Sequence, residues 1–77
     1  MNELIRLAKI AGRGAGAEVA LQNRLGGDLR KRDAFRRAIL KRATSEERRI
    51  ANFALEYSGS DFRVLCNIAA RHGKSAA

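Results

Sequence analysis

The sequence predicts an all-α protein, a small bundle of four to five short helices in one domain that spans residues 1–77. The 77-residue chain contains no proline, and it is rich in alanine, leucine, arginine and glutamate but poor in β-branched residues, which favours helices. A hydrophobic fraction of 45% is high enough for a packed core, while a charged fraction of 31% keeps the surface solvated. A chain of this length buries only about 60% of its unfolded surface, so we expect no second domain.

The first expected helix covers residues 2–11, because Asn2 suits the N-cap position and apolar side chains recur at helical spacing opposite basic ones. The segment GRGAG at residues 12–16 then interrupts it, since each glycine inside a helix costs about 1 kcal/mol relative to alanine. We interpret this segment as a flexible joint. A second, short helix is expected over residues 17–25, closed by the glycine pair that follows it.

Asp28 is a natural N-cap for a third helix that reaches about Ala43 and holds the most basic part of the chain. Projected at about 100° per residue, its apolar residues share one broad face. That face contains Leu29, Phe35, Ile39, Leu40 and Ala43. A separate stripe, open to a partner, contains Arg30, Arg37 and Lys41. Arg32 and Arg36 fall inside the apolar arc, where they must extend along the core edge, pair with acids or lie at an oligomer interface.

Thr44 and Glu47 have the spacing of a capping box, which predicts a fourth helix that runs to Tyr57. The larger apolar side chains of this helix gather on one side, which contains Ile50, Phe53, Ala54 and Tyr57. The core of the protein is therefore expected to contain Leu4, Leu25, Phe35, Ile39, Ile50, Phe53, Leu65 and Ile68.

A last helix is expected after a turn at residues 58–60, with Ser60 as N-cap, Asp61 in its first turn and Gly73 as C-cap. Its inward side contains Phe62, Leu65, Cys66, Ile68 and Ala69, and its outer face contains Arg63, Asn67 and Arg71. Cys66 is interpreted as a small core residue, and His72 as a last-turn residue that stabilises the helix dipole. Residues 74–77 are expected to form a frayed tail.

The sequence predicts neither an enzyme nor a cofactor site. One cysteine and one histidine cannot complete a structural metal site, and no base lies within easy reach of the cysteine on its own helix. No run of about eighteen apolar residues and no signal peptide are recognisable. We therefore expect no membrane contact and a cytoplasmic location.

The basic surface is the strongest functional signal. The net charge is +8, and ten of the sixteen basic residues fall between residues 24 and 49, eight of them arginines. Arginine grips a phosphate with two hydrogen bonds, so this density predicts a DNA-binding regulatory protein held by phosphate contacts. The expected contacts are Arg30, Arg32, Arg36, Arg37, Lys41 and Arg42. Specificity is expected from DNA shape, from a partner, or from Arg63, Asn67 and Arg71.

Two other readings of the basic surface remain open. The chain is alternatively a protein-binding anti-activator, or a phage or plasmid type of inhibitor, that docks on an acidic face of a transcription factor or another host protein. RNA is the less favoured partner, because the chain has only three phenylalanines and one tyrosine and most of them are expected to be buried. A homodimer is also expected, since a small core gains from added burial.

The segment LCNIAARHGKS at residues 65–75 resembles the first half of a bacterial helix-turn-helix. The resemblance rests on Ile68, Ala69 and Gly73, followed by Ser75 in the position that caps a recognition helix. Residues 44–51 resemble the leading helix of such regulators, so the resemblance covers residues 44–75 and implies a transcription regulator. The recognition helix would begin where the chain ends at Ala77. It is therefore expected to be missing, which leaves a helix pair suited to protein contact.

Overall fold

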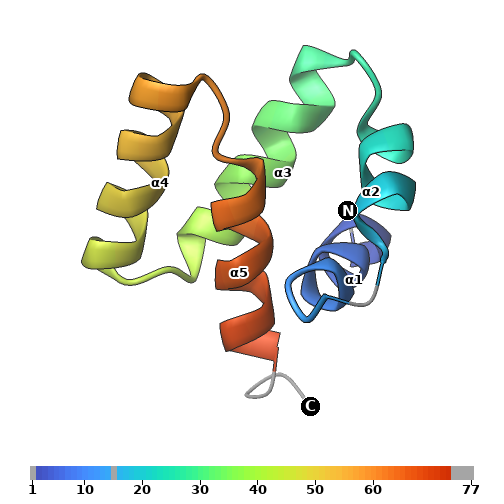
Figure 1. Cartoon of the computed structure of the whole chain (residues 1–77), viewed down its shortest axis with the longest axis horizontal. Helices are drawn as coiled ribbons and strands as arrows, with labels where there is room; N and C mark the ends of the chain where they lie inside the picture. The colour runs from blue at the N-terminus through green and yellow to red at the C-terminus, as the bar shows by residue number, and fades with distance from the viewer. Residues whose placement is uncertain (1, 15, 74–77) are drawn as a thin grey trace.

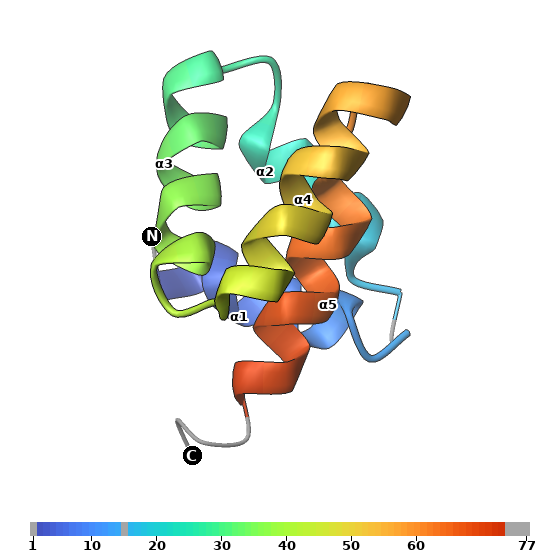
Figure 2. The ribbon, with the colours of Figure 1, turned by 90° about the vertical axis from the view of Figure 1, so that its left-hand side faces the viewer.

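A computed structural model describes residues 2–14 and 16–73 and shows five helices and no strand in those residues (Figures 1 and 2). The helices are α1 (Asn2–Ala11), α2 (Glu18–Leu25), α3 (Leu29–Lys41), α4 (Ser45–Ser58) and α5 (Phe62–Gly73). The predicted all-α fold class is confirmed, and each expected helix is present with ends within two residues of those observed. In this part of the chain no helix is long and apolar enough to cross a membrane. The expected frayed tail and the Ser75 cap lie outside the described residues.

Side-chain caps set the starts of α3 and α4, as predicted. The Asp28 carboxylate accepts hydrogen bonds from the backbone N–H groups of Arg30 (3.0 Å) and Lys31 (3.2 Å). Thr44 Oγ1 accepts from the Glu47 backbone N–H at 3.1 Å, and Glu47 Oε1 accepts from the Thr44 backbone N–H at 2.8 Å. Each cap satisfies backbone donors that a helix start leaves unpaired, which fixes where the helix begins.

The start of α5 differs from the prediction by one residue. The Ser60 hydroxyl accepts a hydrogen bond from the Phe62 backbone N–H at 3.3 Å, and the helix begins at Phe62. Asp61 therefore precedes the helix, and its side chain is buried rather than an exposed charge of the first turn. A buried carboxylate needs a partner, and the partner proves to be an arginine of α3.

Gly12 allows α1 to lie directly against α5, the most extensive contact between two helices in the fold. A Cβ built at Gly12 would lie 2.2 Å from the Cys66 carbonyl oxygen and 2.7 Å from the Ala70 Cβ. Both distances are far below van der Waals contact, so only glycine fits at this crossing. Gly14 and Gly16 serve a different purpose, because their φ angles of 77° and 76° belong to the left-handed region.

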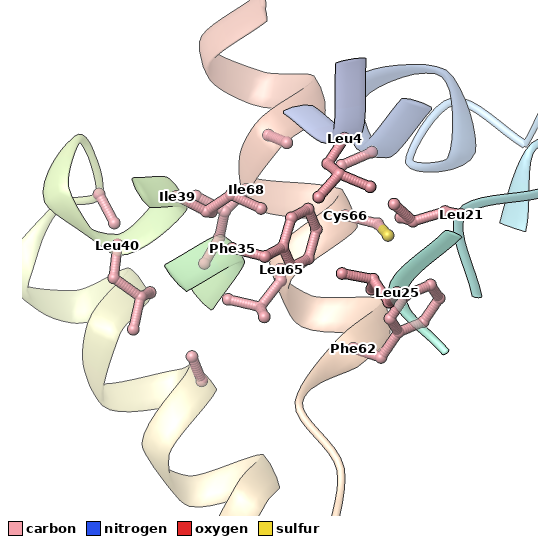
Figure 3. Packing of buried hydrophobic residues seen from close by; sticks show 14 residues of the cluster. Leu4, Leu21, Leu25, Phe35, Ile39, Leu40, Phe62, Leu65, Cys66 and Ile68 are labelled. Carbon is pink, nitrogen blue, oxygen red and sulfur yellow. The ribbon is translucent and has the colours of Figure 1, made fainter. Parts of the chain in front are cut away.

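The core lies among α1, α2, α3 and α5, with the Phe35 ring at its centre (Figure 3). Phe35 is 2% exposed and is the largest fully buried side chain. The other buried hydrophobic residues are Leu4, Ala8, Leu21, Leu25, Ile39, Leu40, Ala43, Ala51, Phe62, Leu65, Cys66, Ile68 and Ala69. All five residues expected on the inward side of the last helix are confirmed. Burial also raises the pKa of the Cys66 thiol to about 11, so this side chain is neutral at neutral pH.

The predicted core positions of Ile50 and Phe53 are wrong. Their side chains are 47% and 60% exposed on the outer face of α4. The helix instead turns Ala51, which is fully buried, and the capping residue Glu47 toward the rest of the protein. A small side chain lets α4 approach closely, so the face with the smaller apolar residues faces inward. Leu29, placed on the apolar face of the third helix, is likewise 79% exposed.

Candidate nucleic-acid interface

A groove of about 450 Å³ opens between α1, the end of α3 and the end of α5. Apolar side chains from all three helices line it, namely Ile5, Ala38, Ile39, Ile68 and Ala69. Four cations also line it: Arg6 and Lys9 from α1, and Lys41 and Arg42 from the end of α3 and its C-cap. We call these four side chains the groove cations. No acidic residue lines the groove within the described part of the chain.

The local structure of each helix places the groove cations. In α1, Leu4 and Ala8 are buried against the core. Arg6 and Lys9, one turn apart, therefore lie on the side of the helix next to this buried face, where they can line the groove. In α3, Ile39 is buried, and Lys41 and Arg42 follow at the C-terminal end, where positive charge is favourable beside the unpaired carbonyl groups. The packing of α1 across the end of α3 then brings the two pairs together.

The groove cations keep their charge available for a ligand. Among the described residues, none of the four makes an ion pair or a side-chain hydrogen bond. Like charges that converge without counter-charges raise the local positive potential and attract an anion. The groove therefore has the electrostatics of a phosphate or carboxylate site.

Arg32 and Arg36, whose surroundings the sequence left open, are bound by the fold itself. Arg36 Nε donates to Asp61 Oδ2 at 2.7 Å, and its guanidinium also donates to the Asn52 side chain. Arg32 Nε donates to the Gly26 carbonyl at 2.7 Å and a terminal nitrogen donates to Gln22 Oε1 at 3.2 Å. Of the three alternatives for Arg32 and Arg36, the structure supports pairing within the chain, with an acid in the case of Arg36. These two arginines tie α3 to its neighbours.

The other residues of α3 that were predicted to contact DNA phosphates do not lie together on one surface. Arg30 and Arg37 are exposed, but Arg37 pairs with Asp33 one turn earlier. Arg30 lies in the first turn of α3, roughly 16 Å along the helix axis from Lys41. Of the six residues proposed from the sequence, only Lys41 and Arg42 line the groove.

The predicted polar face of α5 is confirmed as exposed at Arg63, Asn67 and Arg71. Two of its charges have acidic neighbours: Arg63 lies 3.7 Å from Glu18, and Arg71 lies 3.5 Å from Glu47. None of the three lines the groove. This face is therefore less positive than the groove and separate from it.

The position of Arg6 and Lys9 beside the α3 cations was missed from the sequence. The pattern of the first helix predicts basic side chains opposite the apolar ones, and Arg6 and Lys9 are among these basic side chains. The missing information was tertiary, because no local pattern says which other helix that side will meet. The signal in the sequence that could have indicated these two residues is the pair of basic side chains on one side of the first helix.

Glu47 connects α4 to α5 at one end of the groove. His72, a groove-lining residue, lies with Nε2 2.9 Å from Glu47 Oε1, so it contributes more than the predicted interaction with the helix dipole. The hydrogen bond to His72 and that from the Thr44 backbone lower the pKa of Glu47 to about 2. The carboxylate is therefore ionised in the folded protein across the ordinary pH range.

This lowered pKa predicts how stability depends on pH. An unfolded Glu47 has a pKa near 4.5, so the unfolded state binds more protons than the folded state between about pH 4.5 and pH 2. The contribution of Glu47 is therefore fully present above pH 4.5 and is lost as the pH falls toward 2. We expect Glu47→Gln to cost about 1–2 kcal/mol at neutral pH and to flatten this decline. Urea unfolding of the wild type and of Glu47→Gln at a series of pH values between 7 and 2 measures this difference. Parallel curves of unfolding free energy against pH for the two proteins would contradict the prediction.

Comparison of the chain with protein-family models, curated proteins and solved structures finds no match. Among the described residues, those of the groove have the clearest chemical preference.

Proposed function

We propose that this protein is a small non-enzymatic regulator that binds the phosphate backbone of double-stranded DNA through the groove. The observation that carries the proposal is the convergence of four unneutralised cations from two helices on one groove without an acidic lining residue. The two arginines among them suit bidentate contacts to phosphate oxygens, and the two lysines supply point charges. The net charge of +8 adds long-range attraction toward a polyanion.

The residues that line the groove favour a duplex over a single strand. Proteins that bind single-stranded nucleic acid provide aromatic rings on which unpaired bases stack. No phenylalanine or tyrosine lines this groove, and its apolar residues are aliphatic. Contacts to a continuous sugar-phosphate backbone are then the main source of affinity, which makes binding tolerant of sequence.

Replacement of all four groove cations by alanine is expected to weaken duplex binding by at least about 100-fold, because each removed cation gives up one phosphate contact. Their side chains lie at the surface or at the groove edge rather than in the core, so the helical content should persist. Fluorescence anisotropy with a mixed-sequence duplex measures the affinity, and far-UV circular dichroism checks the fold.

A variant with the same loss of net charge separates the groove from the overall field. Its four alanine substitutions are at Arg30, Arg37, Arg63 and Arg71, none of which lines the groove. We expect this control to bind the duplex within a few-fold of the wild type at physiological salt. Equal weakening of both variants would mean that the groove is not the contact.

Failure of the wild-type protein to bind duplex DNA near physiological salt would overturn the proposal. The groove cations would then face a carboxylate-rich ligand, such as an acidic surface of a transcription factor or another host protein. A matched duplex RNA in the same assay distinguishes DNA from RNA as the source of the phosphates.

A further inference from the structure

The outer face of α4 carries an apolar stripe that no other described helix covers. The stripe contains Ile50, Phe53 and Tyr57, which are 47%, 60% and 71% exposed. These residues are three and four positions apart, so their side chains follow one another along a single side of the helix. The Phe53 and Tyr57 rings stack with their centroids 4.3 Å apart. In Figure 2, α4 lies nearest the viewer, with no helix in front of it.

The exposure of Phe53 and Tyr57 contrasts with the burial of the other aromatic residues. Four aromatic residues occur in the chain, and two of them form the outside of one helix while the other two, Phe35 and Phe62, are buried. The earlier expectation that most of the aromatic residues are buried is therefore wrong. Contiguous exposed apolar surface on a soluble protein commonly marks an interaction site, and rings of this size contribute large contact areas when they are covered.

The charges around the stripe argue against a nucleic acid as its ligand. Helix α4 contains three glutamates and two arginines, whereas the chain as a whole carries +8. Close to the stripe, the exposed Arg49 lies among the exposed Glu46 and Glu56, so the stripe has no excess of positive charge to attract phosphates. A protein surface is the better match.

The charges along one side of the stripe are complementary to the same charges in a second, antiparallel copy of the helix. Arg49 and Glu56 are exposed on the same side of the stripe, two helical turns and about 10 Å apart. Neither makes an ion pair within the described residues. When two identical helices pack antiparallel about a two-fold axis, equivalent flanks face each other. Arg49 then lies opposite Glu56 of a second copy, and Glu56 lies opposite Arg49 of that copy.

We propose that the α4 stripe is the contact surface between two copies of this chain, packed antiparallel about a two-fold axis. The axis passes midway between Arg49 and Glu56, which places Phe53 at the centre of the contact against the same residue of the second copy. Arg32 and Arg36, for which an oligomer interface was one of three alternatives, are bonded within the chain and give no reason for a dimer. No residue of the stripe lines the groove, so the proposal stands independently of DNA binding.

The size of the stripe sets the strength of the dimer. Stable protein interfaces bury about 800 Å² on each partner, and one helix face with three large apolar residues offers roughly half of that. We therefore expect a dimer that dissociates on dilution rather than an obligate one.

Sedimentation velocity over a dilution series tests the proposal. The wild type should shift from monomer to dimer as concentration rises, and Phe53→Glu should weaken the dimer at least about thirtyfold, because it places two carboxylates at the centre of the contact. Val19→Glu is the matched control: Val19 is 69% exposed on α2, at the opposite side of the molecule from α4 in Figure 1. Circular dichroism of both variants verifies that they fold.

A charge exchange tests the geometry. Arg49→Glu and Glu56→Arg should each weaken the dimer about tenfold, while the double variant should restore it to within about threefold of the wild type, because the exchanged charges meet again across the two-fold axis. A wild type that stays monomeric at its highest soluble concentration would overturn the proposal and leave the stripe to a different protein. A dimer insensitive to Phe53→Glu, or a double variant weaker than either single one, would overturn it as well.

Discussion

Gly12→Ala is expected to lower the free energy of unfolding by about 3 kcal/mol or more, the largest loss of any single methyl addition at a described glycine. The added methyl group would lie 2.2 Å from the Cys66 carbonyl oxygen, and that oxygen belongs to the backbone of α5, which cannot move aside like a flexible side chain. Relief requires α1 to separate from α5, the most extensive contact between helices. Overpacking of this kind costs about 3 kcal/mol or more, and the total stability of a chain of this size is about 4–12 kcal/mol.

Gly27→Ala is the matched control for this prediction. A Cβ at Gly27 has no atom within 4 Å, and the residue has no positive φ. The free energy of unfolding should therefore stay the same or rise by a few tenths of a kcal/mol. Urea unfolding followed by circular dichroism compares the two variants. A Gly12→Ala protein with the stability of the wild type would show that α1 does not lie against the α5 backbone.

Phe35→Ala is expected to lower the free energy of unfolding by about 3–5 kcal/mol. The ring is 2% exposed and occupies the middle of the core, beside side chains from α1, α2 and α5 (Figure 3). Its removal takes a large apolar group out of the core. It also leaves a cavity, because the surrounding helices relax only in part to fill the space. In so small a domain this loss approaches the whole stability.

Phe53→Ala provides the comparison, since it removes the same side chain from a helix surface. Phe53 is 60% exposed and stacks on Tyr57, so its loss should cost less than about 1 kcal/mol. The measurement uses thermal or urea unfolding at a protein concentration where the chain is monomeric. Similar losses for the two variants would contradict the placement of the core.

Most of the fold was predictable because its signals are local. Asp28 and the pair Thr44 and Glu47 mark helix starts through hydrogen bonds to backbone groups two or three residues away, and such signals are readable in the sequence. The inward side of α5 was predictable for the same reason. The outer position of Ile50 and Phe53 was not, because α4 has apolar residues on two sides and only the tertiary packing selects the side with Ala51.

The candidate site was predictable only in part. The excess of basic residues and the choice of Lys41 and Arg42, which line the groove of the candidate site, followed from charge and helical spacing. The sequence also indicated that Arg32 and Arg36 needed a special explanation, but their partners Gly26 and Asp61 become neighbours only when α2 and α5 pack on α3. Arg6 and Lys9 joined the site for a similar reason, through the crossing of α1 over the end of α3.

The salt dependence of duplex binding shows whether the groove cations contact phosphates. Four phosphate contacts, one for each groove cation, correspond to a slope at least as steep as about −3.6 in the wild type for the logarithm of affinity against the logarithm of salt concentration. Removal of the four groove cations should reduce the steepness of that slope by about 3.6, one contact for each cation. Phosphate contact by the groove cations therefore gives the four-alanine variant a flatter slope than the wild type. Equal slopes for the two proteins would contradict it.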